Sequence, residues 1–179
     1  RANTSTAERV GEGIYRLTGH KWFMSAPMSD GFVMLAQTRE GIGCFLVPRL
    51  LEDGVSNGLR FQRLKDKIGN RSNASSEVEF TDTFGFLLGK PDAGVRTILD
   101  MVTLTRLDCA LASSGIMRAS LAEAVHHTRG RSVFGKPLVA QPIMTRVLAD
   151  MALDVAGATA LSFRLAEAFD KARDSAEDA

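Results

Sequence analysis

The sequence has few cysteines, no long apolar run and no excess of charge of either sign. Its 179 residues hold two cysteines, Cys44 and Cys109. This excludes a disulfide framework, and a reducing, cytoplasmic setting is expected. No stretch of 18 or more apolar residues is present, which excludes a membrane-spanning helix of ordinary length. With 22 Lys and Arg against 21 Asp and Glu, the charge pattern does not indicate a dedicated nucleic-acid-binding domain.

The motifs of several enzyme classes are also missing. The sequence contains no G-x-S-x-G, C-x-x-C, H-E-x-x-H or G-x-G-x-x-G motif and no P-loop lysine. Its three histidines are His20, His126 and His127. Adjacent residues of a helix point about 100° apart, so His126 and His127 cannot readily share a metal ion. Glu123 and His127 are four residues apart and could, but two ligands do not make a metal site, and none is expected.

Composition changes near residue 90. Residues 1–90 hold 11 glycines and 5 alanines, whereas the remaining residues hold 5 glycines and 17 alanines. Glycine-rich, alanine-poor sequence favours strands and turns, and the reverse favours helix. Short segments separated by turn residues predict strands at 9–10, 14–17, 21–24, 32–36 and 44–47, and alternation of apolar and polar residues predicts strands at 59–64 and 78–80. Many short strands with glycine-marked turns predict an antiparallel sandwich or barrel.

The second half predicts two long helices. Asp92 is the expected N-cap of a helix that starts near Val95 and ends at Gly130. Pro142 suits the first turn of a second helix, which runs up to the polar tail at 174–178. Each helix carries an apolar stripe along most of its length, so two such helices predict half of an antiparallel bundle.

A basic run covers the end of one predicted strand and the loop after it. Its members are Arg60, Arg63, Lys65, Lys67 and Arg71. One interpretation is a strand whose polar edge faces water. The other is a contact with an anion, such as the phosphate of a cofactor. A polynucleotide is the less favoured anion, because aromatic residues are not interleaved with the basic ones.

Two further segments carry groups suited to a ligand. Residues 21–27 bring together the single tryptophan Trp22, Phe23 and the hydroxyl of Ser25. An aromatic wall beside a hydrogen-bond donor suits a planar heterocycle, although packing in a core explains the aromatic residues equally well. Arg131 and Phe134 follow the first long helix, where an arginine can pair with a phosphate and an aromatic ring can stack. Capping of the helix is the alternative there.

Taken in order, these segments resemble the acyl-CoA dehydrogenase family of flavoenzymes. The resemblance rests on Tyr15–Ser25 (YRLTGHKWFMS), Leu64–Ser75 (LKDKIGNRSNAS), Thr105-Arg106 and Arg131–Leu138 (RSVFGKPL). It is strongest to the isovaleryl-CoA dehydrogenase-like branch of the bacterial adaptive response to DNA alkylation. The family fold implies a middle β-domain over residues 1–88 and the first part of a C-terminal helical-bundle domain over residues 89–179. It also implies that the chain is a piece of a longer protein.

The resemblance implies an FAD site built from both halves. Phe23 would lie against the flavin ring, next to Met24, and Ser25 would hydrogen-bond near the reactive nitrogen. Arg131 would reach the FAD pyrophosphate of a neighbouring subunit in a homotetramer or homodimer, with Phe134 close by. The sequence departs from many relatives at Val133, where they have a polar FAD contact, and at Pro142, where they have glutamine.

The implied reaction is α,β-dehydrogenation of an acyl-CoA thioester, with isovaleryl-CoA as a candidate substrate. One branch of the family carries its catalytic base just before an arginine of the first bundle helix, but here Thr105 precedes Arg106. We therefore expect no catalytic base in this chain, with Asp100 and Asp108 as the nearest substitutes. The alternatives are a flavin-containing protein that binds and protects or repairs alkylated DNA through a region absent here, and a scaffold without enzymatic activity.

Overall fold

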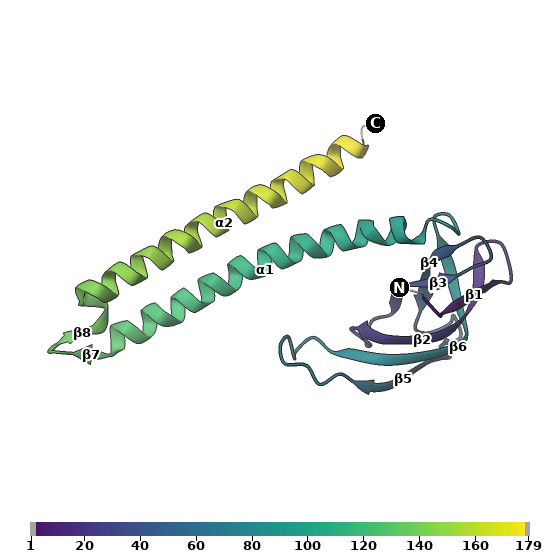
Figure 1. Ribbon diagram of the computed structural model, residues 1–179, viewed down its shortest axis with the longest axis horizontal. Coiled ribbons are helices and arrows are strands. Elements are labelled where there is room, and N and C mark those ends of the chain that lie inside the picture. Colours follow the sequence, from purple (N-terminus) through teal and green to yellow (C-terminus); the bar gives the residue numbers. More distant parts are fainter. Residues whose placement is uncertain (1–2, 178–179) are drawn as a thin grey trace. The chain divides into compact units, whose positions relative to one another are not determined.

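The structure, a computed structural model, describes residues 3–177 (Figure 1). The chain divides into two compact units, the first ending at Met101 and the second beginning at Val102. The division falls inside helix α1 (Gly94–Gly130), so each unit holds part of that helix. A domain boundary between residues 88 and 89 stays a prediction.

The first unit is built on one six-stranded sheet. Its strands are β1 (Thr6–Arg9), β2 (Ile14–Ser25), β3 (Gly31–Gln37), β4 (Ile42–Pro48), β5 (Leu59–Leu64) and β6 (Ser75–Leu88). Their order is β2-β1-β3-β4-β6-β5, and β2 also pairs with β6, which closes the sheet into a barrel. The predicted β-sandwich or barrel is thus confirmed as barrel-like. One pairing differs from the prediction, because Thr6 of β1 and Gln37 of β3 pair in parallel.

Alternating side chains of these strands fill the barrel. Its fully buried members include Leu17, Phe45, Val47, Val78 and Phe80. Strand β6 is longer than the strand predicted at 78–80, because it pairs with β2, β4 and β5. It also contains polar residues, which interrupt the apolar pattern on which the prediction relied. Strand β2 joins the two predicted strands at 14–17 and 21–24 into one.

Helix α1 ends where predicted but begins differently. The Thr97 N–H donates to Ala93 O at 3.0 Å, which makes Ala93 the N-cap residue. The assignment of Asp92 as the N-cap is therefore wrong. The last residue of α1 is Gly130, and helix α2 (Pro142–Glu177) begins at Pro142, as the sequence predicted.

In the second unit, α1 and α2 run antiparallel and are joined by a short hairpin (Figure 1). The hairpin consists of β7 (Ser132–Val133) and β8 (Lys136–Pro137) and is followed by the 3-10 turn η1 (Leu138–Ala140). Large apolar side chains of both helices stay exposed, among them Leu104, Ile116, Leu153, Leu161 and Phe163. Such exposed stripes fit the predicted half of a bundle. Within residues 3–177, no helix has the length and apolar character needed to cross a membrane.

Candidate functional site

A break in the strand pairing exposes the aromatic residues of β2. The register between β2 and β6 shifts between Lys21 and Met24, which is the signature of a β-bulge, and bulges often re-aim side chains next to active sites. Trp22 and Phe23 consequently both face outward, at 58% and 59% exposure, whereas Met24 is buried. The aromatic residues of this segment do not pack in the core, so the core-packing alternative is wrong.

A groove of about 570 Å³ lies beside Phe23 in the first unit. It is lined by Phe23, Met24 and Ser25 at the end of β2, by residues 31–35 of β3, and by the first turns of α1. From α1, Ile98 and Met101 contribute apolar side chains. The structure therefore brings together the three predicted flavin contacts of the β-domain, at the edge of a largely apolar concavity.

The polar groups of this groove are few. Among residues 3–177, the Ser25 hydroxyl has no hydrogen-bond partner, so it is available to a ligand. The ammonium group of Lys21 donates to Leu35 O at 2.8 Å and to Asn3 Oδ1 at 3.1 Å. Burial lowers the pKa of Lys21, because both acceptors are neutral and desolvation disfavours the charged form.

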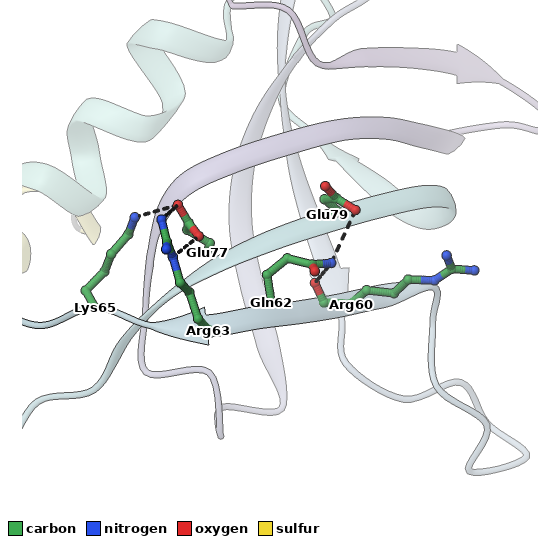
Figure 2. Close-up of polar contacts among 6 residues, drawn as sticks. All are labelled: Arg60, Gln62, Arg63, Lys65, Glu77 and Glu79. Atoms are coloured by element: carbon green, nitrogen blue, oxygen red, sulfur yellow. Dashed lines mark hydrogen bonds and ion pairs between the residues drawn. The ribbon is translucent and has the colours of Figure 1, made fainter.

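Next to the aromatic pair, two cations of the basic run converge on one carboxylate (Figure 2). Arg63 binds Glu77 through two hydrogen bonds, Nε to Oε2 at 2.6 Å and NH2 to Oε1 at 3.2 Å. The ammonium of Lys65 binds Oε1 of the same carboxylate at 2.8 Å. The side chains of Glu77 and Lys65 are only 8% and 9% exposed. The burial of Lys65 therefore contradicts, at this residue, the interpretation of the basic run as a strand edge that faces water.

The other members of the run are held locally or face solvent. Lys67 donates to Asn73 O and to Ser75 Oγ, and Arg71 pairs with Asp66 at 3.4 Å. The guanidinium of Arg60 extends away from the cluster in Figure 2. Most of the run's charge is therefore engaged within the loop and strands that carry it.

The three hydrogen bonds to Glu77 have a consequence for pH dependence. Those from Arg63 and then Lys65 lower the pKa of Glu77 from 4.5 to about 2. Between these two pH values the unfolded chain binds more protons than the folded one. The stabilisation from Glu77 is therefore fully present above about pH 4.5 and is lost as the pH falls towards 2.

We expect Glu77→Gln to lower the urea midpoint of unfolding at pH 7 and to lower it progressively less below pH 4.5. The protonated carboxyl of the native protein resembles the amide, so the two unfolding curves converge at acid pH. Urea titrations across this pH range check the prediction. Glu79→Gln is the matched control, since Glu79 is exposed on the same strand and contacts the Gln62 amide. A midpoint difference that stays constant with pH would contradict the assignment.

In the second unit, the backbone fixes the position of Arg131 at the end of α1. Its N–H donates to His127 O at 3.1 Å, and its carbonyl accepts the Leu138 N–H at 2.7 Å. The Gln141 side-chain amide donates to Val133 O at 2.8 Å, which ties the hairpin to the start of α2. In the described part of the chain, the exposed guanidinium of Arg131 has no ion pair, so it is available to an anion.

Phe134 occupies a strained position at the tip of this hairpin. Its φ is 52° and that of Gly135 is 77°, which are the values of a type I′ turn, where Asn-Gly is preferred. A phenylalanine there costs on the order of 1 kcal/mol or more. Its ring is 93% exposed, so packing within the unit does not repay this strain. A ring kept at such a position favours a contact outside the unit.

The first helix offers no obvious catalytic base. The Thr105 hydroxyl donates to Val102 O of its own helix at 2.8 Å. Asp100 and Asp108 are both exposed on α1. Over the described residues, no group of three or more His, Cys, Asp or Glu side chains is placed to hold a metal ion.

The sequence analysis did not predict the buried carboxylate of Glu77 or the hydrogen bonds of Lys21 to Leu35 O and Asn3 Oδ1. Glu77 follows two serines and precedes the predicted strand at 78–80, so no apolar alternation marks it as buried. Its pairing with Arg63 arises from the register between β5 and β6. Opposite charges on two strands that pair are the signal that could have indicated it.

Comparison with known proteins agrees with this architecture. Residues 1–83 match the model of the acyl-CoA dehydrogenase middle domain, and residues 92–179 match that of the acyl-CoA dehydrogenase C-terminal domain. The first match covers most of the barrel-like sheet, and the second covers helices α1 and α2. The chain therefore belongs to the acyl-CoA dehydrogenase family, whose members are flavoproteins.

Individual relatives narrow the resemblance. The chain is 54% identical over 176 residues to Escherichia coli (strain K12) AidB, covering 98% of this chain and 32% of that protein. This confirms the resemblance to the alkylation-response branch. Among solved structures, Caenorhabditis elegans ACDH-11 in complex with C11-CoA superimposes with a TM-score of 0.84 at 31% identity, covering 90% of this chain and 29% of that one.

A third relative is butyryl-CoA dehydrogenase from Megasphaera elsdenii. It superimposes with a TM-score of 0.77 at 28% identity, covering 90% of this chain and 43% of that one. The chain thus spans less than half the length of each of these three relatives.

Proposed function

We propose that this chain forms part of an FAD-dependent acyl-CoA dehydrogenase that oxidises an acyl thioester between its α- and β-carbons. The observation that supports this most strongly is the groove in which an exposed Phe23 and an unpaired Ser25 hydroxyl lie together. A flat apolar face beside a hydrogen-bond donor fits a flavin ring. FAD, when bound, supplies a site that accepts a hydride from the β-carbon.

The residues of this chain bind and orient rather than react. Phe23 would pack against one face of the ring, while the buried Met24 fixes the end of β2 beneath it. Ser25 would donate a hydrogen bond to the edge of the ring and so set its rotation in the groove. Arg131 would pair with the pyrophosphate of FAD bound to a neighbouring subunit, because a guanidinium offers two parallel donors to a phosphate. Phe134 would stack nearby.

The proton at the α-carbon requires a base from elsewhere in the protein. The Thr105 hydroxyl donates into its own helix and does not ionise at neutral pH. Asp100 and Asp108, the nearest carboxylates, lie exposed on α1. We therefore propose that this chain contributes flavin contacts and no catalytic base.

The absorbance spectrum of the purified protein tests the proposal. We expect flavin bands after reconstitution of the full-length protein with FAD and their bleaching when isovaleryl-CoA is added without oxygen, because the rest of that protein supplies the base and hydride transfer removes the oxidised chromophore. Butyryl-CoA is the matched straight-chain comparison for the acyl preference. A protein that binds no flavin under these conditions contradicts the assignment.

The alternative reading, a flavoprotein that protects or repairs alkylated DNA, receives no support from the basic run, since Arg63, Lys65 and Arg71 pair with carboxylates. An electrophoretic shift of duplex DNA would favour it.

We also propose a homotetramer or homodimer in the cytoplasm. The exposed apolar faces of α1 and α2 support self-association, and two free thiols, Cys44 and Cys109, suit a reducing compartment.

A further inference from the structure

Lys65 lies against Trp22 and Phe23, of which Phe23 lines the groove, and the proposed function does not use Lys65. Its backbone N–H donates to Ser75 O at 2.7 Å, which anchors it to the start of β6. Its Nζ is 3.2 Å from the centroid of the Trp22 ring and 5.1 Å from that of Phe23. These distances lie within the range of cation–π contacts. One buried ammonium therefore touches both exposed rings.

The carboxylate of Glu77 fixes this ammonium in place. Lys65 donates to Oε1 at 2.8 Å, and Arg63 holds the same carboxylate from its other side with two hydrogen bonds. A carboxylate that accepts from two side chains cannot rotate freely, so Lys65 has one favoured position. An ammonium carries three N–H donors. Those not used by Glu77 can face the electron-rich rings.

The two rings need such a support. They sit at the bulge of β2, where regular pairing with β6 lapses, and each is more than half exposed. The other contacts of Trp22 are longer, 5.7 Å to the guanidinium of Arg63 and 6.2 Å between its ring and that of His20. An unsupported ring would populate several rotamers and lose that freedom when a ligand binds. Lys65 reduces this cost before binding.

We propose that Lys65 is a positioning residue of the candidate flavin site, which orients Trp22 and Phe23 so that Phe23 presents a fixed wall to the groove. The proposal rests on the proposed function for the identity of the ligand. It does not rest on it for the orientation of the rings, which is a property of the protein without a ligand. Glu77 acts through Lys65, and neither side chain reacts.

The fluorescence of Trp22 tests the orientation directly, because this is the single tryptophan of the sequence. In the protein without FAD, we expect Lys65→Met to raise the acrylamide quenching constant about twofold and to lower the anisotropy, since the indole loses its main contact. Lys65→Arg keeps a cation at this position and is expected to restore the native values. Arg60→Met is the matched control, because it removes a cation of the same strand whose guanidinium extends away from Glu77 (Figure 2).

Titration with FAD tests the consequence for the site. We expect Lys65→Met to bind FAD about tenfold more weakly, because the rings must then be ordered during binding, and Lys65→Arg to recover most of the affinity. Native quenching in Lys65→Met overturns the proposal. So does native FAD affinity, even where the quenching has risen.

Two further results are decisive. If circular dichroism shows that Lys65→Met does not fold, Lys65→Gln replaces it, because glutamine keeps a hydrogen bond to Glu77 without a charge. The same rise in the quenching constant is expected for Lys65→Gln. A native quenching constant in Lys65→Gln overturns the proposal. If the native protein binds no FAD, the proposed function fails. The quenching series then still decides whether Lys65 orients the rings.

Discussion

Substituting Gly94 by alanine is expected to destabilise the first unit by about 3 kcal/mol, at the upper end of the cost of overpacking a core. A Cβ at this position would lie 2.4 Å from Gly43 C, 2.6 Å from Ile42 O and 2.7 Å from Cys44 N. All three are backbone atoms of β4, which cannot move aside as a flexible side chain would. Helix α1 would have to shift away from the sheet.

Strand β4 cannot move away from the helix instead. A Cβ on Gly43 would already lie 2.8 Å from the Phe45 ring, and Phe45 is fully buried in the barrel. The start of α1 is therefore seated on β4 with no spare room. This contact also sets the positions of Ile98 and Met101, which line the groove beside Phe23.

Urea unfolding followed by Trp22 fluorescence measures the effect in the unit that contains Gly94. Gly115→Ala is the matched control in the same helix, since a Cβ there meets no atom within 4 Å. Because Gly115 lies in the second unit and alanine is favoured over glycine in a helix by about 1 kcal/mol, this variant is not expected to lower the midpoint that Trp22 reports. Equal midpoints for Gly94→Ala and the native protein would refute the close seating of α1.

Local signals in the sequence predicted the elements that depend on local chemistry. The strand at 59–64 and the start of α2 at Pro142 lie where alternation and proline placed them. Gly130 is likewise the last residue of α1, but its φ is not positive, so it ends the helix without the left-handed conformation of a glycine cap. Asp92 failed as an N-cap because the close contact of Gly94 with β4, a tertiary contact, sets where the helix begins.

The sequence predicted the residue types of the candidate site, but it did not predict the bulge and the ion pair that hold them in place. The segment around Phe23 and Ser25 was found because an aromatic wall beside a hydroxyl suits a planar ligand. Its exposure depends on a bulge created by pairing with β6, about 50 residues away in sequence. The contact of Lys65 with Glu77 likewise depends on how the segment after β5 lies along β6, where the Lys65 N–H donates to Ser75 O, and alternation within one strand cannot reveal it.

Arg131→Ala is expected to weaken FAD binding by about 30- to 150-fold, corresponding to about 2–3 kcal/mol for paired hydrogen bonds from a charged donor. The hairpin that holds Arg131 is tied at both ends, through His127 and Leu138. The guanidinium is thus presented on a fixed backbone, which reduces the entropy lost on binding. Retention of FAD through dialysis, followed by the flavin absorbance, measures the loss.

Two variants separate the geometry of the guanidinium from its charge. Arg131→Lys keeps the positive charge but not the two parallel donors, so it is expected to bind FAD with intermediate affinity. Arg129→Ala removes an exposed arginine from the last turn of α1 and serves as the control for net charge.

If Arg131→Ala retains FAD as the native protein does, the pyrophosphate is bound elsewhere. Equal losses for Arg129→Ala and Arg131→Ala would instead assign the effect to the net charge of the helix end. A loss confined to Arg131 requires a phosphate placed against this one guanidinium, and the strained, exposed Phe134 three residues later is then a candidate to stack on the nucleotide.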